Sequence, residues 1–185
     1  DNGCDGGADV VFSHLGRHEL FDDADLEGFL FDDLEVSVHN NASATGNDLD
    51  NVITGNDGDN VIMGLGGEDI LAGGLGFDTL TGGDAADTFV LESLAHADLI
   101  TDYDFDTEGD KIDIGNLLNQ AFGGTGGEVD TSVSSEYVQV VDAGDGNATL
   151  QVDVDGGGDS WQDAATLQNV DLSMGDTIRV VLDSD

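Results

Sequence analysis

Residues 46–90 read GNDLDNVIT, GNDGDNVIM, GLGGEDILA, GGLGFDTLT and GGDAADTFV, which are five consecutive nonamers without an insertion. Every nonamer begins with glycine, carries a large apolar residue at position eight, and has Asn or Asp at position six. A strict period of nine residues indicates an architecture of stacked repeats. The position-six residues are Asn51, Asn60, Asp69, Asp78 and Asp87.

Nine residues of this composition predict half a coil of a parallel β-roll. Positions seven to nine are β-prone and extend for only ~10 Å, whereas the Gly, Asn and Asp of positions one to six favour tight turns. Two nonamers then complete one coil, and stacked coils give two parallel sheets with position eight between them. We therefore expect an all-β fold, a parallel β-roll (β-solenoid) with a β-rich C-terminal cap. The position-eight residues are Ile53, Ile62, Leu71, Leu80 and Phe89.

The outward side chains of the odd-numbered nonamers are distinctly apolar. Because an apolar sheet face is normally buried, we expect the segment after Val90 or the N-terminal strands to cover this face. The outward residues are Val52, Thr54, Ile70, Ala72, Thr88 and Val90.

This geometry also stacks each turn directly on the turn two nonamers away. Carboxylates stacked at ~4.8 Å repel one another, and a hard cation such as Ca²⁺ accepts both carboxylate and carbonyl oxygens. We predict about three inter-turn Ca²⁺ sites, between 46–51 and 64–69, 55–60 and 73–78, and 64–69 and 82–87. Besides position six, the predicted ligands come from positions one and three: Gly46, Asp48, Gly55, Asp57, Gly64, Gly66, Gly73, Leu75, Gly82 and Asp84.

The charge of the chain supports cation binding. Among 185 residues there are 41 Asp+Glu and three Lys+Arg, a formal net charge of −38, so self-repulsion opposes a compact state unless cations bind. A solvating acidic coat is the other reading, but here many acids recur in the nonamer frame. The charge argues against nucleic acid as a partner, and no apolar run approaches the ~18 residues of a membrane span. The single cysteine, Cys4, has no partner for an internal disulfide.

The sequence offers no constellation for catalysis. His14 and His18 are four apart, but Leu15 stands where the H-E-x-x-H zinc motif requires glutamate. The serines lack a G-x-S-x-G context. We therefore expect the chain not to be an enzyme.

The repeats resemble the RTX (repeats-in-toxin) nonapeptide G-G-x-G-x-D-x-U-x. Residues 73–81, GGLGFDTLT, match every fixed position, whereas Asn51 and Asn60 replace its Asp and Leu65 replaces its second glycine. The resemblance implies a calcium-binding β-roll. The block from Asp98 to Leu118 is similar to the segment that closes RTX rolls, which implies that Asp102, Asp110 and Asp113 are candidates for a further calcium at the end of the stack.

The C-terminal part reads as strands around turns. Residues 135–142 and 147–155 predict a hairpin, and Asp153 and Asp155 suggest a calcium loop with oxygens at alternate positions. Residues 137–182 resemble the C-terminal target region of type I secretion substrates, particularly those that end large biofilm adhesins.

These inferences divide the chain into an N-terminal β-rich segment (1–43), an RTX β-roll (44–92), and a C-terminal cap with the secretion signal region (93–185). We expect a monomeric, calcium-dependent folding and type I secretion module of a secreted or cell-surface adhesin from a Gram-negative bacterium. The secretion machinery would be its partner, without membrane insertion. The alternative is the non-catalytic RTX tail of a secreted protease, lipase or toxin, and residues 1–43 could belong to a sugar-binding module.

Overall fold

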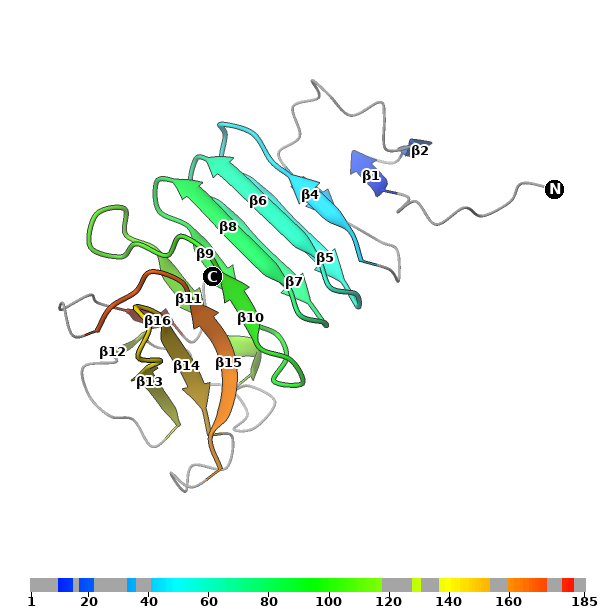
Figure 1. The fold of residues 1–185 in the computed structure, drawn as a ribbon. Coiled ribbons are helices and arrows are strands. Elements are labelled where there is room, and N and C mark those ends of the chain that lie inside the picture. Colours follow the sequence, from blue (N-terminus) through cyan, green and yellow to red (C-terminus); the bar gives the residue numbers. More distant parts are fainter. Residues whose placement is uncertain are drawn as a thin grey trace.

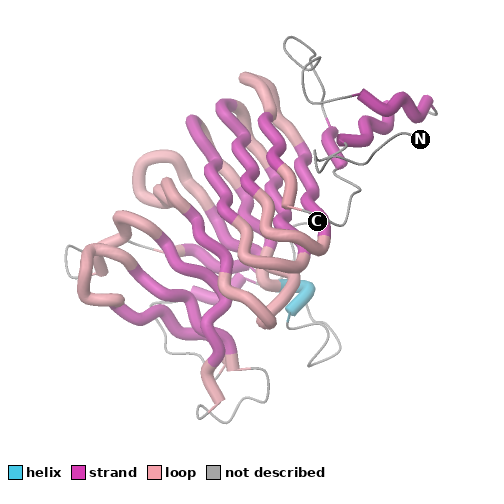
Figure 2. The backbone as a smooth tube through the Cα atoms, turned by 45° about the vertical axis from the view of Figure 1, so that its right-hand side comes forward, coloured by secondary structure: helices cyan, strands magenta, loops and turns pink. Residues whose placement is uncertain are grey.

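The computed structural model describes residues 10–14, 17–21, 33–35, 41–117, 128–130, 137–153, 160–172 and 178–181. For 10–14, 17–21, 33–35 and 128–130 it describes the backbone only. The described residues are nearly all in strands, turns and loops (Figure 2). No helix within these ranges has the length and apolar character that crossing a membrane requires.

The nonamers form alternate strands of two parallel sheets (Figure 1). The first sheet contains β5 (Val52–Asn56), β7 (Ile70–Gly74) and β9 (Thr88–Val90), and the second contains β4 (Ser43–Thr45), β6 (Val61–Gly66) and β8 (Thr79–Asp84). Ile53 pairs with Leu71 and Leu71 with Phe89, so each coil consumes two nonamers. The predicted parallel β-roll is confirmed.

The interior of the roll is built from the position-eight side chains. Ile53, Leu71, Leu80 and Phe89 have no exposed surface, and Ile62 is 1% exposed. Each strand contributes one large apolar residue to this interior, because its neighbours in the sequence point outward.

Leu71→Ala is expected to destabilise the calcium-loaded protein by about 2–5 kcal/mol, because the deletion leaves a cavity between two sheets that cannot close up. Leu75 is a matched control, since it is 48% exposed in a turn, and Leu75→Ala should change stability by about 0.5 kcal/mol or less. Urea denaturation in saturating calcium measures both. Equal effects would show that position eight is not the core.

Both sheets continue beyond the repeats into the C-terminal cap. β10 (Asp98–Ile100) pairs with β8 and β15 (Gln162–Leu167), and β11 (Lys111–Asp113) pairs with β9 and β16 (Arg179–Val181), all in parallel. β12 (Glu128–Asp130) then pairs with β16. The predicted hairpin is confirmed, because β13 (Val138–Asp142) and β14 (Ala148–Val152) are antiparallel. The cap is therefore β-rich and shares the sheets of the roll.

The sheets also begin before the first nonamer. β1 (Val10–His14) and β2 (Arg17–Phe21) pair with each other, whereas β3 (Asp33–Glu35) pairs with β5 and β4 pairs with β6. The predicted boundaries after residues 43 and 92 thus lie within two continuous sheets, and the division into three parts stays a prediction.

The outer face of the first sheet is covered unevenly. Ala72 is 8% and Thr88 4% exposed, but Val52 is 40% and Ile70 37% exposed. The expectation of a fully covered face is wrong at these two residues. The reason lies in the topology: β10, β11, β15 and β16 extend the hydrogen-bonded edges of the sheets, where unpaired backbone groups need partners.

Candidate metal centre

The turns of the roll stack in two columns. Edge A consists of turns 46–51, 64–69, 82–87 and 101–110, which lead from the second sheet to the first. Edge B consists of turns 55–60, 73–78 and 91–98, which lead from the first sheet to the second. The last turn of each edge lies outside the nonamers.

The position-six side chains form a buried ladder along each edge. On edge A, Asn51 N donates to Asp69 Oδ1 at 2.7 Å and Asp69 N donates to Asp87 Oδ1 at 2.8 Å. On edge B, Asn60 N donates to Asp78 Oδ1 at 2.7 Å. All five residues are at most 2% exposed. One oxygen of each Asp thus joins its turn to the previous turn of the same edge.

The second oxygen of each Asp in this ladder has no such partner. Oδ2 of Asp69, Asp78 and Asp87 is buried without a hydrogen bond from any described residue. Burial raises the pKa of Asp69 and of Asp78 to about 6, and that of Asp87 to about 7, from a usual value of 3.8. Because an unpaired buried charge is costly, these oxygens require either a proton or a cation.

The two Asn residues differ from the Asp residues in this respect. Oδ1 of Asn51 accepts a hydrogen bond from Asn47 N at 2.8 Å, and Oδ1 of Asn60 accepts one from Asn56 N at 3.0 Å. The amide oxygen in these turns is therefore satisfied locally. The turns that need a cation are therefore the three with Asp at position six.

Glycine at position one makes room beside the unpaired oxygen. A Cβ on Gly64 would lie 2.0 Å from Asp69 Oδ2 and 2.6 Å from the carbonyl oxygen of Gly82 in the next turn. A Cβ on Gly73 would lie 2.2 Å from Asp78 Oδ2, and one on Gly82 would lie 2.1 Å from Asp87 Oδ2. Carboxylate and carbonyl oxygens therefore share a space without side chains, and mixed oxygen ligands of this kind suit Ca²⁺.

The position-three residues lie farther out. Asp48, Asp57 and Asp84 are exposed, Leu75 is 48% exposed and Gly66 is partly buried. Because these side chains are exposed, these positions would contribute through their backbone carbonyls. In the described ranges no three His, Cys, Asp or Glu side chains are grouped to hold a metal by themselves. Any inter-turn site therefore depends on the backbone.

The residues predicted at the end of the stack fall into two places. Asp110 is 1% exposed, and its Oδ1 accepts a hydrogen bond from Asp87 N at 2.9 Å. Asp102 accepts hydrogen bonds from Gly82 N and Gly83 N, both at 3.0 Å. Asp113 lies at the other end of β11, where its Oδ1 accepts a bond from Gly115 N. The structure therefore joins Asp102 and Asp110 to edge A, but not Asp113.

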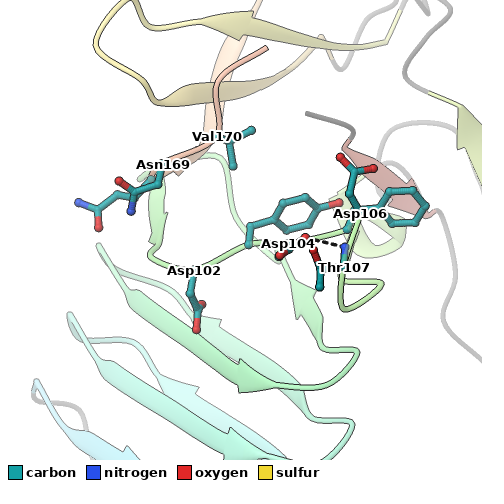
Figure 3. Close-up of a pocket in the computed structure, with 9 residues that line it drawn as sticks. Asp102, Asp104, Asp106, Thr107, Asn169 and Val170 are labelled. Atoms are coloured by element: carbon teal, nitrogen blue, oxygen red, sulfur yellow. Dashed lines mark hydrogen bonds between the residues drawn. The ribbon is translucent and has the colours of Figure 1, made fainter. Parts of the chain in front are cut away.

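Turn 101–110 also borders a cavity of about 370 Å³, whose other wall is residues 168–170 of the cap. Figure 3 shows Asp102, Asp104 and Asp106 at this cavity, with Asp104 accepting a hydrogen bond from Thr107 N at 2.8 Å. The last turn of edge A is therefore acidic and open on its cap side.

The other predicted loop is described only in part. Asp153 is fully buried at the end of β14, and its N donates to Tyr137 O at 2.9 Å. Asp155 lies outside the described residues. This predicted calcium loop stays a prediction.

Asp98 is a ladder residue that sequence reasoning did not select. It is 5% exposed, and its Oδ1 accepts a hydrogen bond from Asp78 N at 3.0 Å, as a position-six residue does. The sequence held a signal, because Asp-Leu-Ile-Thr at 98–101 repeats the pattern Asp-Thr-Leu-Thr at 78–81. The spacing of 20 residues, in place of 18, concealed it.

Comparison with known proteins agrees with this geometry. Residues 45–80 and 64–93 match the family model of the RTX calcium-binding nonapeptide repeat. A solved structure, that of the AlgE6R3 subunit from the Azotobacter vinelandii mannuronan C5-epimerase, is 25% identical with a TM-score of 0.53, covering 77% of this chain and 80% of that chain. A search of curated proteins found no significant relative.

The fold and its edges therefore define a calcium-binding β-roll. The repeats of this chain are RTX calcium-binding nonapeptides. Calcium as the bound metal is confirmed at this level, whereas the number of sites and the individual ligands remain predictions.

Proposed function

We propose that this chain is a calcium-dependent folding and type I secretion module at the C-terminal end of a large secreted or cell-surface bacterial adhesin. The observation that supports the proposal most directly is the set of buried, unpaired oxygens of Asp69, Asp78 and Asp87. These oxygens need a proton or a cation, and at neutral pH we expect a chain with a net charge of −38 to take up the cation. Extracellular location is typical of RTX repeats.

The mechanism we propose is linkage between binding and folding. Where calcium is scarce, repulsion between the acids opposes the stacking of turns, and an extended chain suits passage through a secretion channel. Outside the cell, bound calcium would neutralise the ladder carboxylates. Each site that binds only the folded chain adds about 2.7 kcal/mol of stability at a hundredfold excess of free calcium over Kd.

Calcium titration followed by far-UV circular dichroism tests this mechanism. We expect β-sheet signal and melting temperature to rise with calcium. Magnesium at equal concentration should have much less effect, because it demands a stricter octahedron and retains its waters. A metal-free chain that already shows full β-sheet signal and the same melting temperature would contradict the mechanism.

Export is a separate part of the proposal and has its own test. The chain, fused behind a passenger protein, should direct it to the medium of cells that express a type I secretion system. A passenger retained in these cells, while the chain still folds with calcium, would remove the secretion role and leave the calcium module.

The RTX tail of a secreted enzyme is the second candidate. It is favoured by the similarity to the AlgE6R3 subunit of a mannuronan C5-epimerase. In either case we propose that this chain itself is not catalytic, is monomeric, and binds neither nucleic acid nor the lipid bilayer. Sequencing the gene upstream distinguishes the candidates, because an adhesin has tandem repeats there and an enzyme has a catalytic domain.

A further inference from the structure

Edge B does not end with the nonamers. β10 continues the second sheet, with Leu99 opposite Thr79 and Ile100 opposite Leu80. Leu99 N donates to Asp78 O at 2.8 Å, the same bond and length as Thr79 N to Asn60 O one coil earlier. Turn 91–98 is therefore stacked on turn 73–78 in the register of a repeat, although its sequence is not a nonamer.

Asp98 occupies the ladder position in this last turn. Its Oδ1 accepts from Asp78 N at 3.0 Å, as Asp78 Oδ1 accepts from Asn60 N at 2.7 Å. Both carboxylates are buried, Asp78 at 1% and Asp98 at 5% exposure. Two acids thus adjoin the same gap between turns.

The second oxygen of Asp78 is buried without a hydrogen bond from any described residue. Asp78 Oδ1 points back to turn 55–60, while Oδ2 lies beside Gly73, within 2.2 Å of where a Cβ would be. In earlier turns, a Cβ built on the glycine at position one would lie 2.2 to 2.6 Å from a carbonyl oxygen of the next turn. This holds for Gly46, Gly55 and Gly64. At Gly73 the three nearest atoms all belong to Asp78, at 2.2 to 2.6 Å, so no atom of turn 91–98 fills the space beside Asp78 Oδ2 as closely.

The two described cationic side chains, Lys111 and Arg179, do not belong to these turns. Lys111 is on β11 after edge A, and Arg179 is on β16. His96 is in turn 91–98, but it is exposed and stacks on the ring of Phe77 with centroids 4.4 Å apart. The pair therefore lacks a buried positive charge.

We propose that the gap between turns 73–78 and 91–98 binds a calcium ion through the carboxylates of Asp78 and Asp98. This site rests on the proposed calcium-dependent folding, and it lies beyond the three gaps that the nonamers define. It would sit where the roll meets the cap, because β10 pairs with β8 on one side and with β15 on the other. Calcium here would join the repeats to the C-terminal strands.

Counting bound calcium in the full chain tests the proposal. Asp98→Asn keeps the shape of the side chain and its oxygen for Asp78 N, but removes the charge. We expect native mass spectrometry and calorimetric titration to show one calcium fewer per chain than in the unmodified protein, with the remaining ions still folding the roll. Asp145→Asn, in the exposed β13–β14 turn, is the matched control and should retain every ion.

An unchanged count in Asp98→Asn would overturn the inference and would favour a proton shared by the two acids. Should the variant fail to fold, the anomalous scattering of calcium in crystals of the unmodified chain decides, because an ion between Asp78 and Asp98 supports the site and an empty gap overturns it. The proposed function fails separately, if the unmodified chain does not respond to calcium at all.

Discussion

Gly64→Ala is expected to destabilise the calcium-loaded protein by about 4 kcal/mol or more. The added methyl group would lie 2.0 Å from Asp69 Oδ2 and 2.6 Å from Gly82 O, so both the carboxylate and the next turn have to move. Overpacking of this kind costs about 1–3 kcal/mol, and the loss of one calcium site adds about 2.7 kcal/mol at a hundredfold excess of calcium. Urea denaturation in saturating calcium measures the change.

Gly144→Ala is the control for this substitution. Gly144 has φ +82°, but its Cβ would meet no heavy atom within 4 Å. Gly144→Ala should therefore reduce stability only by the strain of the left-handed conformation, about 1–2 kcal/mol. If Gly64→Ala lowers the free energy of unfolding no more than Gly144→Ala does, the glycines at position one do not shape a binding space. They would then be needed only for the conformation of the turn.

The period of nine residues predicts both the core and the register of the roll. Ile53, Leu71 and Phe89 follow one another at intervals of 18 residues, and they pair in that order. A strict period leaves the chain only one way to stack without turning the apolar side chains outward. The buried position-six ladders follow from the same constraint.

Departures from the glycine pattern also turn out to be informative. Leu65 and Ala85 stand where the RTX nonapeptide has glycine, and they adopt φ values of 89° and 86°. The stacking of the turn thus imposes a left-handed backbone on residues that disfavour it. The sequence alone shows the substitution, but not whether the turn keeps its shape.

The ends of the roll could not be predicted from the period. Asp98 and Asp110 continue the ladders at spacings of 20 and 23 residues, because a ladder needs only an acid placed just before a paired strand. At the other end, Ala42 and Ala44 take the places of positions six and eight without an oxygen or a large side chain; Val61 N donates to Ala42 O at 2.9 Å. Pairing continues there although the sequence signal has ended.

The resemblance of residues 98–118 to the segment that closes RTX rolls does not separate Asp110 from Asp113, but the structure does. Asp110 directly precedes β11 and Asp113 is the last residue of β11, so three residues of extended backbone, ~10 Å, separate them. One acid therefore belongs to edge A, and the other lies at the far side of the sheet. Which acids meet therefore depends on whether each one lies before or after its strand, because the two ends of a strand belong to opposite edges of the roll.

The metal-free and calcium-loaded proteins are expected to respond to pH in opposite directions. In the metal-free fold, burial raises the pKa of the ladder carboxylates from 3.8 to about 6 or 7. Between these values the folded chain holds more protons than the unfolded chain, so the free energy of unfolding falls as pH rises from about 4 to about 7. The residues are Asp69, Asp78, Asp87, Asp98 and Asp110.

Calcium reverses this trend, because it binds carboxylates only after they lose their protons. Its affinity should therefore increase from pH 5 to pH 8, with release of protons that can be measured in a weakly buffered titration. Melting temperatures recorded across this range, on protein depleted of metal and on protein saturated with calcium, should give curves of opposite slope. A carboxyl whose pKa is raised from 3.8 to about 6 destabilises the metal-free fold at neutral pH by about 3 kcal/mol relative to acid, and one raised to about 7 by about 4 kcal/mol. If the metal-free chain instead gains stability up to pH 8, its ladder carboxylates are ionised and paired without calcium, and the cation is not what their burial requires.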